Sequence, residues 1–467
     1  MRAVRSWLSG IVLITGGVAL PPQGMAQTES QGDSAPSTLE ERVDELDQQV
    51  RILQRLRELA AESLATAGKD RQSATANAKD GFSLKSADGK YTLRIRGYAQ
   101  ADGRFFPSDD SKAIANSFFL RRARPILEAA VGRYFEFRIM PDFAQGQTTL
   151  FDAYWDGKFV PAFTVRAGKF KPPVGFERLQ SATDITFAER GLPTNLAPNR
   201  DVGLQLAGDI SEGLFAYQVG VFDGVPDLGN GDADFNDSKD LAGRVFFQPI
   251  KRGTLKGLGF GVSGSTGQEL GTPSTTAPTA TGLPAYRSPS QQTVFRYRSD
   301  AVVPANSVIA DGRRNRVSPH AYLGLGSLGV LGEYIVSTQE VRLGSAATKL
   351  SHKAWQASAG YFLTGEQAGF RSPMPKKPFD LKEGGWGALE IAARYGELDL
   401  DDDAFPVFAN PSTAVSKEKA VGLGLNWYLT KQVKVSVNYE HTTFEGGAAD
   451  GDRPSEDFVV TRFQHSF

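Results

Sequence analysis

The sequence predicts an all-β protein, a 16-stranded antiparallel transmembrane β-barrel preceded by a short α-helical coiled coil. Three observations predict this fold. Segments from residue 91 onward alternate apolar and polar residues, as strands with two different faces do. The connections between them alternate between short and long. Only 40% of the residues are hydrophobic, yet the chain has 30 Phe, 13 Tyr and 50 Gly, which is typical of a barrel with a wet interior. A large soluble all-β protein is the alternative.

The N-terminus has the three parts of a secretory signal peptide. Arg2 and Arg5 precede an apolar run at 7–20, and small residues precede Gln27. We expect cleavage after Ala26, which makes residues 1–26 the signal peptide and leaves 27–38 disordered. The run is too short for a stop-transfer helix, and an N-terminal membrane anchor is the alternative. Export from a Gram-negative-type cell predicts the cell outer membrane as the location.

A heptad pattern at 39–65 predicts a periplasmic coiled coil. Val at a positions and Leu at d positions form the seam, which consists of Leu39, Val43, Leu46, Val50 and Leu53. Isolated helices of this length are marginal in water, so we expect self-association, with a lone amphipathic helix as the alternative. Residues 66–82 are small and polar and predict a flexible linker.

The remaining residues, 83–467, predict the barrel. Many alternating segments run ten to fifteen residues, the length of tilted strands that cross a bilayer. The expected strands lie at 91–106, 116–131, 133–144, 149–160, 162–171, 200–210, 214–222, 239–249, 255–268, 313–326, 329–343, 350–363, 386–399, 417–429, 432–445 and 456–467. An even number places both ends of the barrel on the periplasmic side.

The connections support this orientation. Long polar loops at 171–199, 223–239, 269–313 and 400–416 alternate with short turns, which is the outer-membrane pattern of long outer loops and short periplasmic turns. The segment 269–313 has room for a further strand pair, with 294–297 and 302–303 as candidates. The connection at 364–385 is too long for an ordinary periplasmic turn.

Several classes of site are excluded or unsupported. The chain has no Cys, which excludes disulfides, thiolate metal sites and cysteine nucleophiles. The net charge of −1 gives no basic field for nucleic acid. The histidines lack metal-type spacing, and there is no GxSxG or phosphate-binding loop motif. We therefore expect no catalytic residue, metal or cofactor. A barrel-anchored protease or lipase and a coiled-coil adhesin are the alternatives.

Several stretches resemble the phosphate-selective porin O and P family. They include FFLRRARPILEAAVG (118–132), DAYWDGKF (152–159), VRAGKFKPPVGFERL (165–179), DITFAERGLPTNLAPNRDVGLQL (184–206), GALEIAARYGELDL (387–400) and LNWYLTKQVKVSVNYEHT (425–442). The resemblance covers roughly residues 81–467. It implies a trimeric 16-stranded porin whose third loop folds into the lumen.

The candidate pore-lining residues are mostly basic. Loop 171–199 is the expected constriction, because so long a loop is usually functional or disordered; a plain extracellular loop is the alternative. Arg122 and Arg124 share one face of their strand. Arg121 points oppositely unless a β-bulge re-aims it. The inward arginines resemble the arginine ladder of the family, and Arg121-Arg122 match its paired arginines. The pore-lining or anion-binding candidates are Arg94, Arg96, Arg104, Arg121, Arg122, Arg124, Lys169, Lys171, Arg178, Arg190, Arg200 and Asp152.

These residues predict a water-filled diffusion channel for small anions, because rings of Arg or Lys select anions. The resemblance implies phosphate or pyrophosphate as the solute. Residues 91–220 hold 16 Lys+Arg against 14 Asp+Glu. Pairing of the arginines with Asp102, Glu128, Glu136 and Asp152 would instead leave a general, weakly selective porin. The expected partners are outer-membrane lipid, further copies in a homotrimer, and the barrel-assembly machinery, which would read the C-terminal Phe467.

Overall fold

The computed structural model describes residues 38–69, 73–77, 81–107, 115–232, 236–250, 252–255, 257–273, 278–300 and 302–467. The chain forms two units, 1–68 and 69–467. The expected signal peptide and the expected disordered segment up to residue 37 lie outside the described residues. Among the described residues, no helix is both long and apolar enough to cross a membrane.

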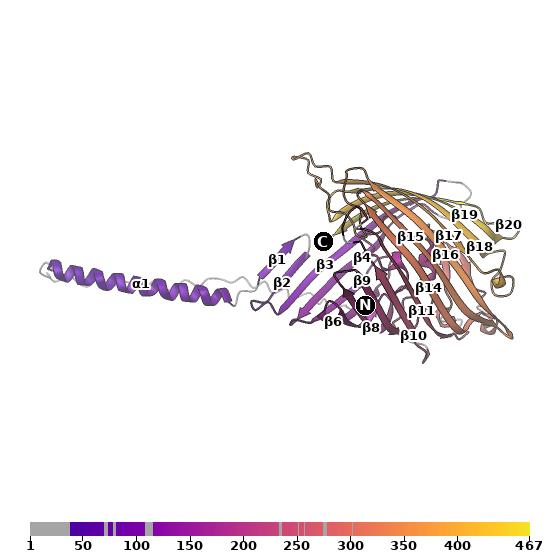
Figure 1. The fold of residues 1–467 in the computed structure, drawn as a ribbon, viewed down its shortest axis with the longest axis horizontal. Coiled ribbons are helices and arrows are strands. Elements are labelled where there is room, and N and C mark those ends of the chain that lie inside the picture. Colours follow the sequence, from indigo (N-terminus) through magenta and orange to yellow (C-terminus); the bar gives the residue numbers. More distant parts are fainter. Residues whose placement is uncertain are drawn as a thin grey trace, which may run out of the picture. The chain divides into compact units, whose positions relative to one another are not determined.

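The first unit contains the long helix α1 (Leu39–Lys69) (Figure 1). The helix ends a few residues later than the expected coiled coil. Its seam is exposed in the single chain, with Leu39, Val43 and Leu53 at 83%, 57% and 64% of full exposure. Such a stripe is stable in water chiefly when a partner helix covers it.

The second unit is a closed antiparallel barrel, and the predicted count of 16 strands is confirmed. The wall consists of β3 (Tyr91–Phe105), β4 (Ser117–Val131), β5 (Phe135–Asp142), β6 (Thr149–Val160), β7 (Phe163–Phe170), β8 (Asp201–Ile210), β9 (Phe215–Phe222), β10 (Asp240–Phe247), β11 (Gly259–Leu270), β14 (Ile309–Leu325), β15 (Leu328–Leu343), β16 (Ala346–Phe362), β17 (Ala388–Asp399), β18 (Val415–Tyr428), β19 (Val433–Ala448) and β21 (Glu456–Ser466). Pairing of β21 with β3, from Val459↔Phe105 to Ser466↔Tyr98, closes the ring. Closure leaves no wall strand with an unpaired edge in lipid.

A small hairpin precedes the barrel, in the segment expected to be a linker. It consists of β1 (Ser73–Asn77) and β2 (Gly81–Lys85). Strand β2 pairs with β3 from Phe82↔Ile95 to Lys85↔Thr92, where β21 no longer reaches. The hairpin therefore supplies hydrogen-bond partners to an otherwise open stretch of β3. The small, polar residues of β1 have no apolar alternation, so they gave no strand signal.

The connections leave the barrel at two ends. We call the end where β3 begins and β21 finishes the turn end, and the opposite end the loop end. Most connections at the turn end are short and most at the loop end are long. Connection 363–387 is a long one at the turn end, and residues 344–345 form a short turn at the loop end. The loop after β11 contains the separate hairpin of β12 (Ala285–Arg287) and β13 (Thr293–Arg296). Thus 294–296 is a strand outside the wall, whereas 302–303 is not a strand.

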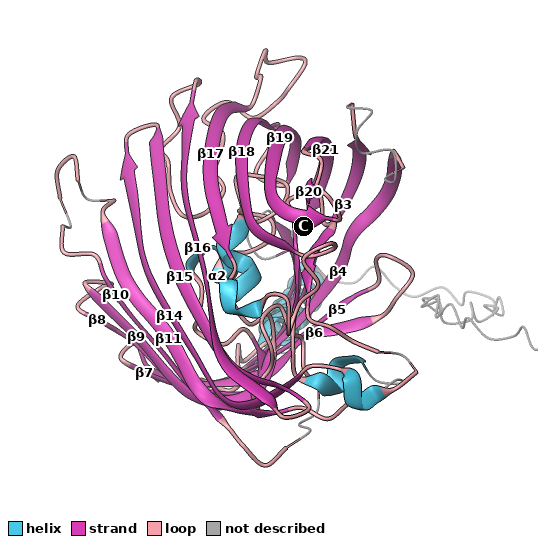
Figure 2. Ribbon diagram, turned by 90° about the vertical axis from the view of Figure 1, so that its right-hand side faces the viewer, coloured by secondary structure: helices cyan, strands magenta, loops and turns pink. Residues whose placement is uncertain are grey.

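The remaining elements are short. They are α2 (Phe176–Leu179), β20 (Gly451–Asp452), and the 3-10 helices η2 (Leu192–Leu196), η3 (Pro278–Thr281), η4 (Pro304–Asn306) and η5 (Asp402–Ala404). Figure 2 shows α2 inside the ring of strands. The loop that carries α2 and η2, residues 171–200, therefore lies within the barrel, and we call it the inner loop.

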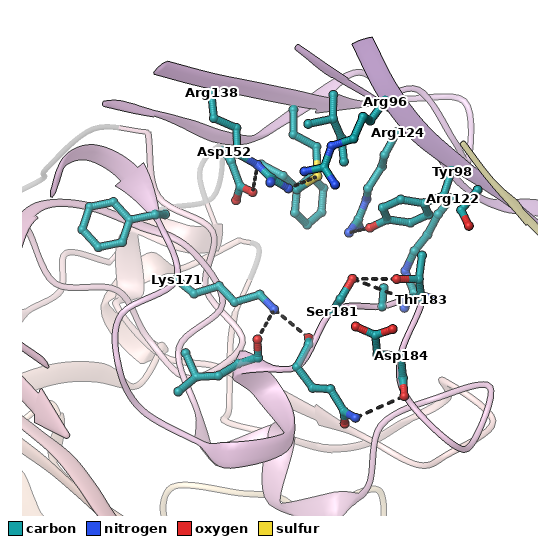
Figure 3. A pocket seen from close by; sticks show the side chains of 18 of the residues that line it. Arg96, Tyr98, Arg122, Arg124, Arg138, Asp152, Lys171, Ser181, Thr183 and Asp184 are labelled. Carbon is teal, nitrogen blue, oxygen red and sulfur yellow. Dashed lines mark hydrogen bonds and ion pairs between the residues drawn. The ribbon is translucent and has the colours of Figure 1, made fainter. Parts of the chain in front are cut away.

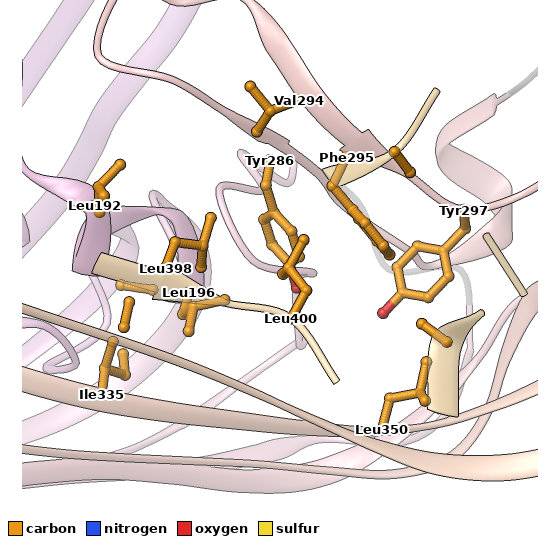
Figure 4. Close-up of a cluster of buried hydrophobic side chains, with 14 of the residues drawn as sticks. Leu192, Leu196, Tyr286, Val294, Phe295, Tyr297, Ile335, Leu350, Leu398 and Leu400 are labelled. Atoms are coloured by element: carbon orange, nitrogen blue, oxygen red, sulfur yellow. The ribbon is translucent and has the colours of Figure 1, made fainter. Parts of the chain in front are cut away.

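An apolar core fills part of the barrel interior (Figure 4). Leu192 and Leu196 of the inner loop pack with Phe295 of the hairpin and with inward side chains of the wall, such as Ile335 and Leu398. Inward-facing apolar residues are stable here because loops, not water, cover them. The space accessible to water therefore lies on the other side of the barrel, beside the earlier wall strands.

Candidate functional site

A large cavity of about 1130 Å³ lies between the inner loop and the wall from β3 to β10. Its charged lining is strongly asymmetric, with twelve Arg and two Lys against three acids. The bases are Arg94, Arg96, Arg121, Arg122, Arg124, Arg138, Arg166, Arg178, Arg190, Arg200, Arg244, Arg371, Lys171 and Lys431, and the acids are Glu128, Asp152 and Asp184. Figure 3 shows wall arginines on one side of this lumen cavity and Lys171 and Ser181 of the loop on the other.

A β-bulge turns Arg121 toward the lumen. In the pairing of β3 with β4, Gln100 lies opposite Arg122 and Ala101 lies opposite Leu120, so Arg121 is the extra residue. Strict alternation would have placed its side chain in lipid, and the bulge re-aims it. Arg121, Arg122 and Arg124 all line the lumen cavity as a result.

The wall arginines share few acids. Arg96 lies 2.6 Å and Arg138 2.8 Å from Glu128, while Arg138 and Arg200 lie 3.3 Å and 3.2 Å from Asp152. Each carboxylate is thus shared between two guanidinium groups. Pairing across the wall exists, but it neutralises only part of the positive charge.

Aromatic rings hold other arginines in place. The guanidinium of Arg124 lies 3.9 Å from the ring centre of Phe151, and that of Arg166 lies 4.0 Å from the ring centre of Tyr154. The negative face of a ring attracts a cation without cancelling its charge. Both arginines also pair with buried acids, Arg124 with Asp142 and Arg166 with Asp156, each at 2.7 Å. They therefore keep a fixed direction, but their charge is largely compensated.

The basic residues of the inner loop bond to carbonyl oxygens. Lys171 Nζ donates to the carbonyl of Gln180 at 2.9 Å, and Arg178 Nη2 donates to that of Thr194 at 2.9 Å. Arg190 Nη2 donates to the Gln180 carbonyl at 2.7 Å. A carbonyl orients a cation but carries no net charge, so the loop presents uncompensated positive charge at the lumen.

The close packing of these basic groups lowers the pKa values of Lys171 and Arg190 in the loop. Burial and the neighbouring Arg200 and Arg190 hold the pKa of Lys171 well below its usual range. Burial, opposed by Glu177, lowers the pKa of Arg190 to about 10. Like charges disfavour one another's charged forms. An anion placed among these bases would therefore stabilise their charged forms.

Contacts from the wall fix the position of the loop. Glu333 of β15 accepts hydrogen bonds from the backbone N–H groups of Phe176 (2.5 Å) and Glu177 (3.1 Å). The Phe176 ring stacks on His320 at 4.5 Å and on Phe370 of connection 363–387 at 4.6 Å. The long connection thus reaches from the turn end to the inner loop.

The structure brings ten of the twelve candidate residues to the lumen cavity. Arg104 instead lines a smaller cavity of about 470 Å³, the loop-end cavity, together with Arg121 and Arg287. Lys169 lines neither cavity, because it pairs with Asp232 of the loop after β9. A lysine at the end of a strand is close enough to the next long loop to be neutralised by it, which the strand pattern alone could not reveal.

Sequence reasoning missed five bases that line the lumen cavity, namely Arg138, Arg166, Arg244, Arg371 and Lys431. Arg138 and Arg166 lie on predicted strands, and alternation would have placed both inward. Arg371 lies in the long connection, for which no pattern was available. The near balance of charge in residues 91–220 reflects local pairing as well as acids away from the cavity. Asp142, Asp156 and Glu189 pair with Arg124, Arg166 and Arg121 inside the barrel.

Comparisons with known proteins agree with this arrangement. A family model described as phosphate-selective porin O and P matches residues 93–467. Porin O of Pseudomonas aeruginosa is 24% identical over 433 residues, which cover 83% of this chain and 91% of that protein. The outer membrane channel DcaP of Acinetobacter baumannii has a TM-score of 0.51 at 11% identity, over 82% of this chain and 99% of its own.

The Salmonella typhi OmpF structure in complex with daunomycin has a TM-score of 0.51 at 12% identity, over 81% of this chain and 98% of its own. At such identity the solved structures show the fold alone, a closed outer-membrane β-barrel. The family model matches most of the sequence, from the first wall strand to the last residue. The chain therefore belongs to the phosphate-selective porin O and P family and is a porin of the outer membrane.

Proposed function

We propose that the protein is a diffusion channel that prefers small anions, with phosphate and pyrophosphate among its solutes, and that it has no enzymatic activity. The observation that carries the proposal is the lining of the lumen cavity, where fourteen bases face three acids. The family description, which names phosphate, also supports it.

The proposed mechanism is electrostatic. Fixed cations in a narrow, partly desolvated passage act at a lower effective dielectric than charges at a wide mouth. They raise the local concentration of anions, and salt screens the effect. Conduction also needs release, and the shared carboxylates Glu128 and Asp152 reduce the hold on a multivalent anion.

Reversal potentials across planar bilayers test the proposal. In a KCl gradient at low ionic strength we expect anion preference that weakens as salt rises. Replacing chloride by phosphate then separates the alternatives, because a general porin would treat the two anions alike. Cation preference, or no conductance from correctly folded protein, would refute the proposed function.

The pH dependence follows from Lys171. Its pKa is lowered, so it loses its charge at a lower pH than an exposed lysine, whose pKa is about 10.4. Anion preference should therefore be complete on the acid side and should fall as pH rises through the lowered pKa. Reversal potentials measured at rising pH, kept below the pKa of about 10 of Arg190, check this. Lys171→Arg should flatten the profile, and an unchanged profile in that variant would contradict the assignment.

We further propose that α1 assembles a homotrimer through its exposed seam. Replacing Val43, Leu46 and Val50 by Asn should lower the yield and thermal stability of the trimer, because these side chains would lose their apolar partners. Barrels that still insert are expected. The matched control changes Asp44, Asp47 and Arg51, which lie off the seam, to Asn. Equal trimer stability in both variants would contradict the role of the helix.

A further inference from the structure

Glu189, near the end of the inner loop, is enclosed by four arginines. We call Arg104 of β3, Arg121 and Arg122 of β4, and Arg462 of β21 the arginine cage. Glu189 Oε1 lies 3.2 Å from Arg104 Nη2, 2.6 Å from Arg121 Nε and 3.1 Å from Arg462 Nη2. Glu189 Oε2 accepts from Arg121 Nη2 at 3.0 Å and lies 3.7 Å from Arg122 Nη2. Arg121 therefore grips the carboxylate with two parallel N–H groups, as it would grip a free oxyanion.

The cage itself belongs entirely to the barrel wall. One wall acid accompanies it, Asp102, which receives two hydrogen bonds of 2.7 Å from Arg462 and lies 3.9 Å from Arg104. Four arginines with one aspartate leave three positive charges directed at one point. Without a further anion this convergence would be strongly unfavourable. The wall thus presents converging positive charge, and the carboxylate that compensates it comes from a different part of the chain.

The loop delivers that carboxylate in a fixed position. The backbone N–H of Ala188 donates to Asn438 at 2.7 Å, and Arg394 Nη1 donates to the carbonyl of Glu189 at 2.9 Å. Glu189 is only 3% exposed. Burial alone would raise the pKa of Glu189, but Arg121, Arg122 and Arg462 hold it well below its usual range. The carboxylate is therefore charged and held in the cage.

The cage lies where it can act on permeating ions. Arg121 and Arg122 line the lumen cavity, and Arg104 and Arg121 line the loop-end cavity. An anion that passes between the two cavities therefore meets arginines whose strongest donors are already engaged by Glu189.

We propose that the arginine cage is a binding site for small oxyanions and that Glu189 occupies it as a tethered ligand, which limits how tightly the pore holds a passing anion. This inference rests on the proposed anion channel. Conduction requires binding weak enough for release. Because the tethered carboxylate occupies the arginine cage, a passing anion cannot bind there tightly. Glu189 is thus a residue that determines specificity through the arginines that it engages.

The test removes the carboxylate and offers a free one. Single-channel currents in KCl are recorded for wild type, Glu189→Ala and Glu189→Gln while formate or phosphate is added. Formate can refill the space of the lost carboxylate in Glu189→Ala, so half-block should need at least about tenfold less formate than in wild type. Glu189→Gln fills that space and should be blocked less by formate than Glu189→Ala. Block by phosphate at the same low concentration would show that the cage also takes a tetrahedral anion, whereas block by formate alone would restrict it to carboxylates.

The matched control is Glu177→Ala. Glu177 lies in the same loop and is similarly buried, but its carboxylate accepts from Gly191 N–H and the Gln356 side chain, and Arg190 reaches only its backbone carbonyl. Equal block of wild type and Glu189→Ala, or the same gain of block in Glu177→Ala, would overturn the proposal. If Glu189→Ala does not assemble, the test is the thermal stability of Glu189→Gln in detergent, measured with and without phosphate. A larger stabilisation by phosphate than in wild type supports the site, and an equal one overturns it. Cation preference of the wild type would refute the proposed function, whatever the block shows.

Discussion

Replacing Lys171, Arg178 and Arg190 together by Glu is expected to turn the anion preference of the pore into cation preference at low salt. Their hydrogen bonds go to carbonyl oxygens, so each contributes a nearly uncompensated charge. At an effective dielectric of 20, a unit charge about 8 Å from an ion contributes about 2 kcal/mol. Since 1.4 kcal/mol is a factor of ten, three reversals should lower the ratio of anion to cation permeability by far more than about tenfold.

The reversal potential in a KCl gradient measures this shift. A variant with Gln at the three positions keeps side-chain donors for the carbonyl groups and should shift the potential in the same direction by a smaller amount. The matched control places Glu at Arg313, Lys349 and Lys353, which are exposed and line neither cavity. If that control shifts the potential as far, the inner loop is not the constriction.

Replacing Glu333 by Ala should loosen the inner loop and raise both mean conductance and current noise. The carboxylate of Glu333 holds the N–H groups of Phe176 and Glu177, and both residues are buried. A hydrogen bond to a charged group contributes about 1.5–3 kcal/mol. Local opening at α2 should therefore become more frequent by at least about tenfold. Hydrogen exchange at these two amides, together with single-channel recording, measures the effect.

Glu340→Ala is the matched control, on the same strand. Glu340 also accepts from a backbone N–H, that of Arg313, but this is a wall residue at the loop end. Its loss should leave the exchange of the Phe176 and Glu177 amides unchanged. Slow exchange of both amides in Glu333→Ala would show that the aromatic stack around Phe176 suffices to hold the loop.

The wall was predictable because a strand between lipid and water must alternate. All sixteen predicted strands are present, and most ends agree within a few residues. The short hairpin of β1 and β2 escaped prediction because β1 has no apolar face and β2 has only Phe82 and Leu84 on its apolar face. Connection 363–387 could be recognised only as too long. Its contact with the inner loop depends on Phe370 stacking on Phe176, which is distant in the chain, and no local pattern encodes that contact.

The candidate site was predictable in kind but not in detail. Alternation placed Arg122 and Arg124 inward. Whether Arg121 joined them depended on a single extra residue in the strand, which the sequence allowed but did not require. Nothing in the sequence distinguishes Glu189 from the other acids of loop 171–199. Its position in the arginine cage depends on Arg462, which lies 273 residues away in the chain, so only the closed barrel brings the cage together.

The one-sided filling of the barrel has a consequence for how such a channel can evolve. On β15 to β17, inward residues such as Ile335 and Leu398 belong to a dry core, where a polar replacement would undo the packing of the loops. On β3 to β10, inward side chains border the lumen cavity, where a partly exposed charge such as Arg94 can be exchanged at lower cost in stability than the buried, paired Arg122 and Arg124. A lineage of these channels can therefore change its cargo by single substitutions on the wet wall, while the dry wall conserves the shape of the passage.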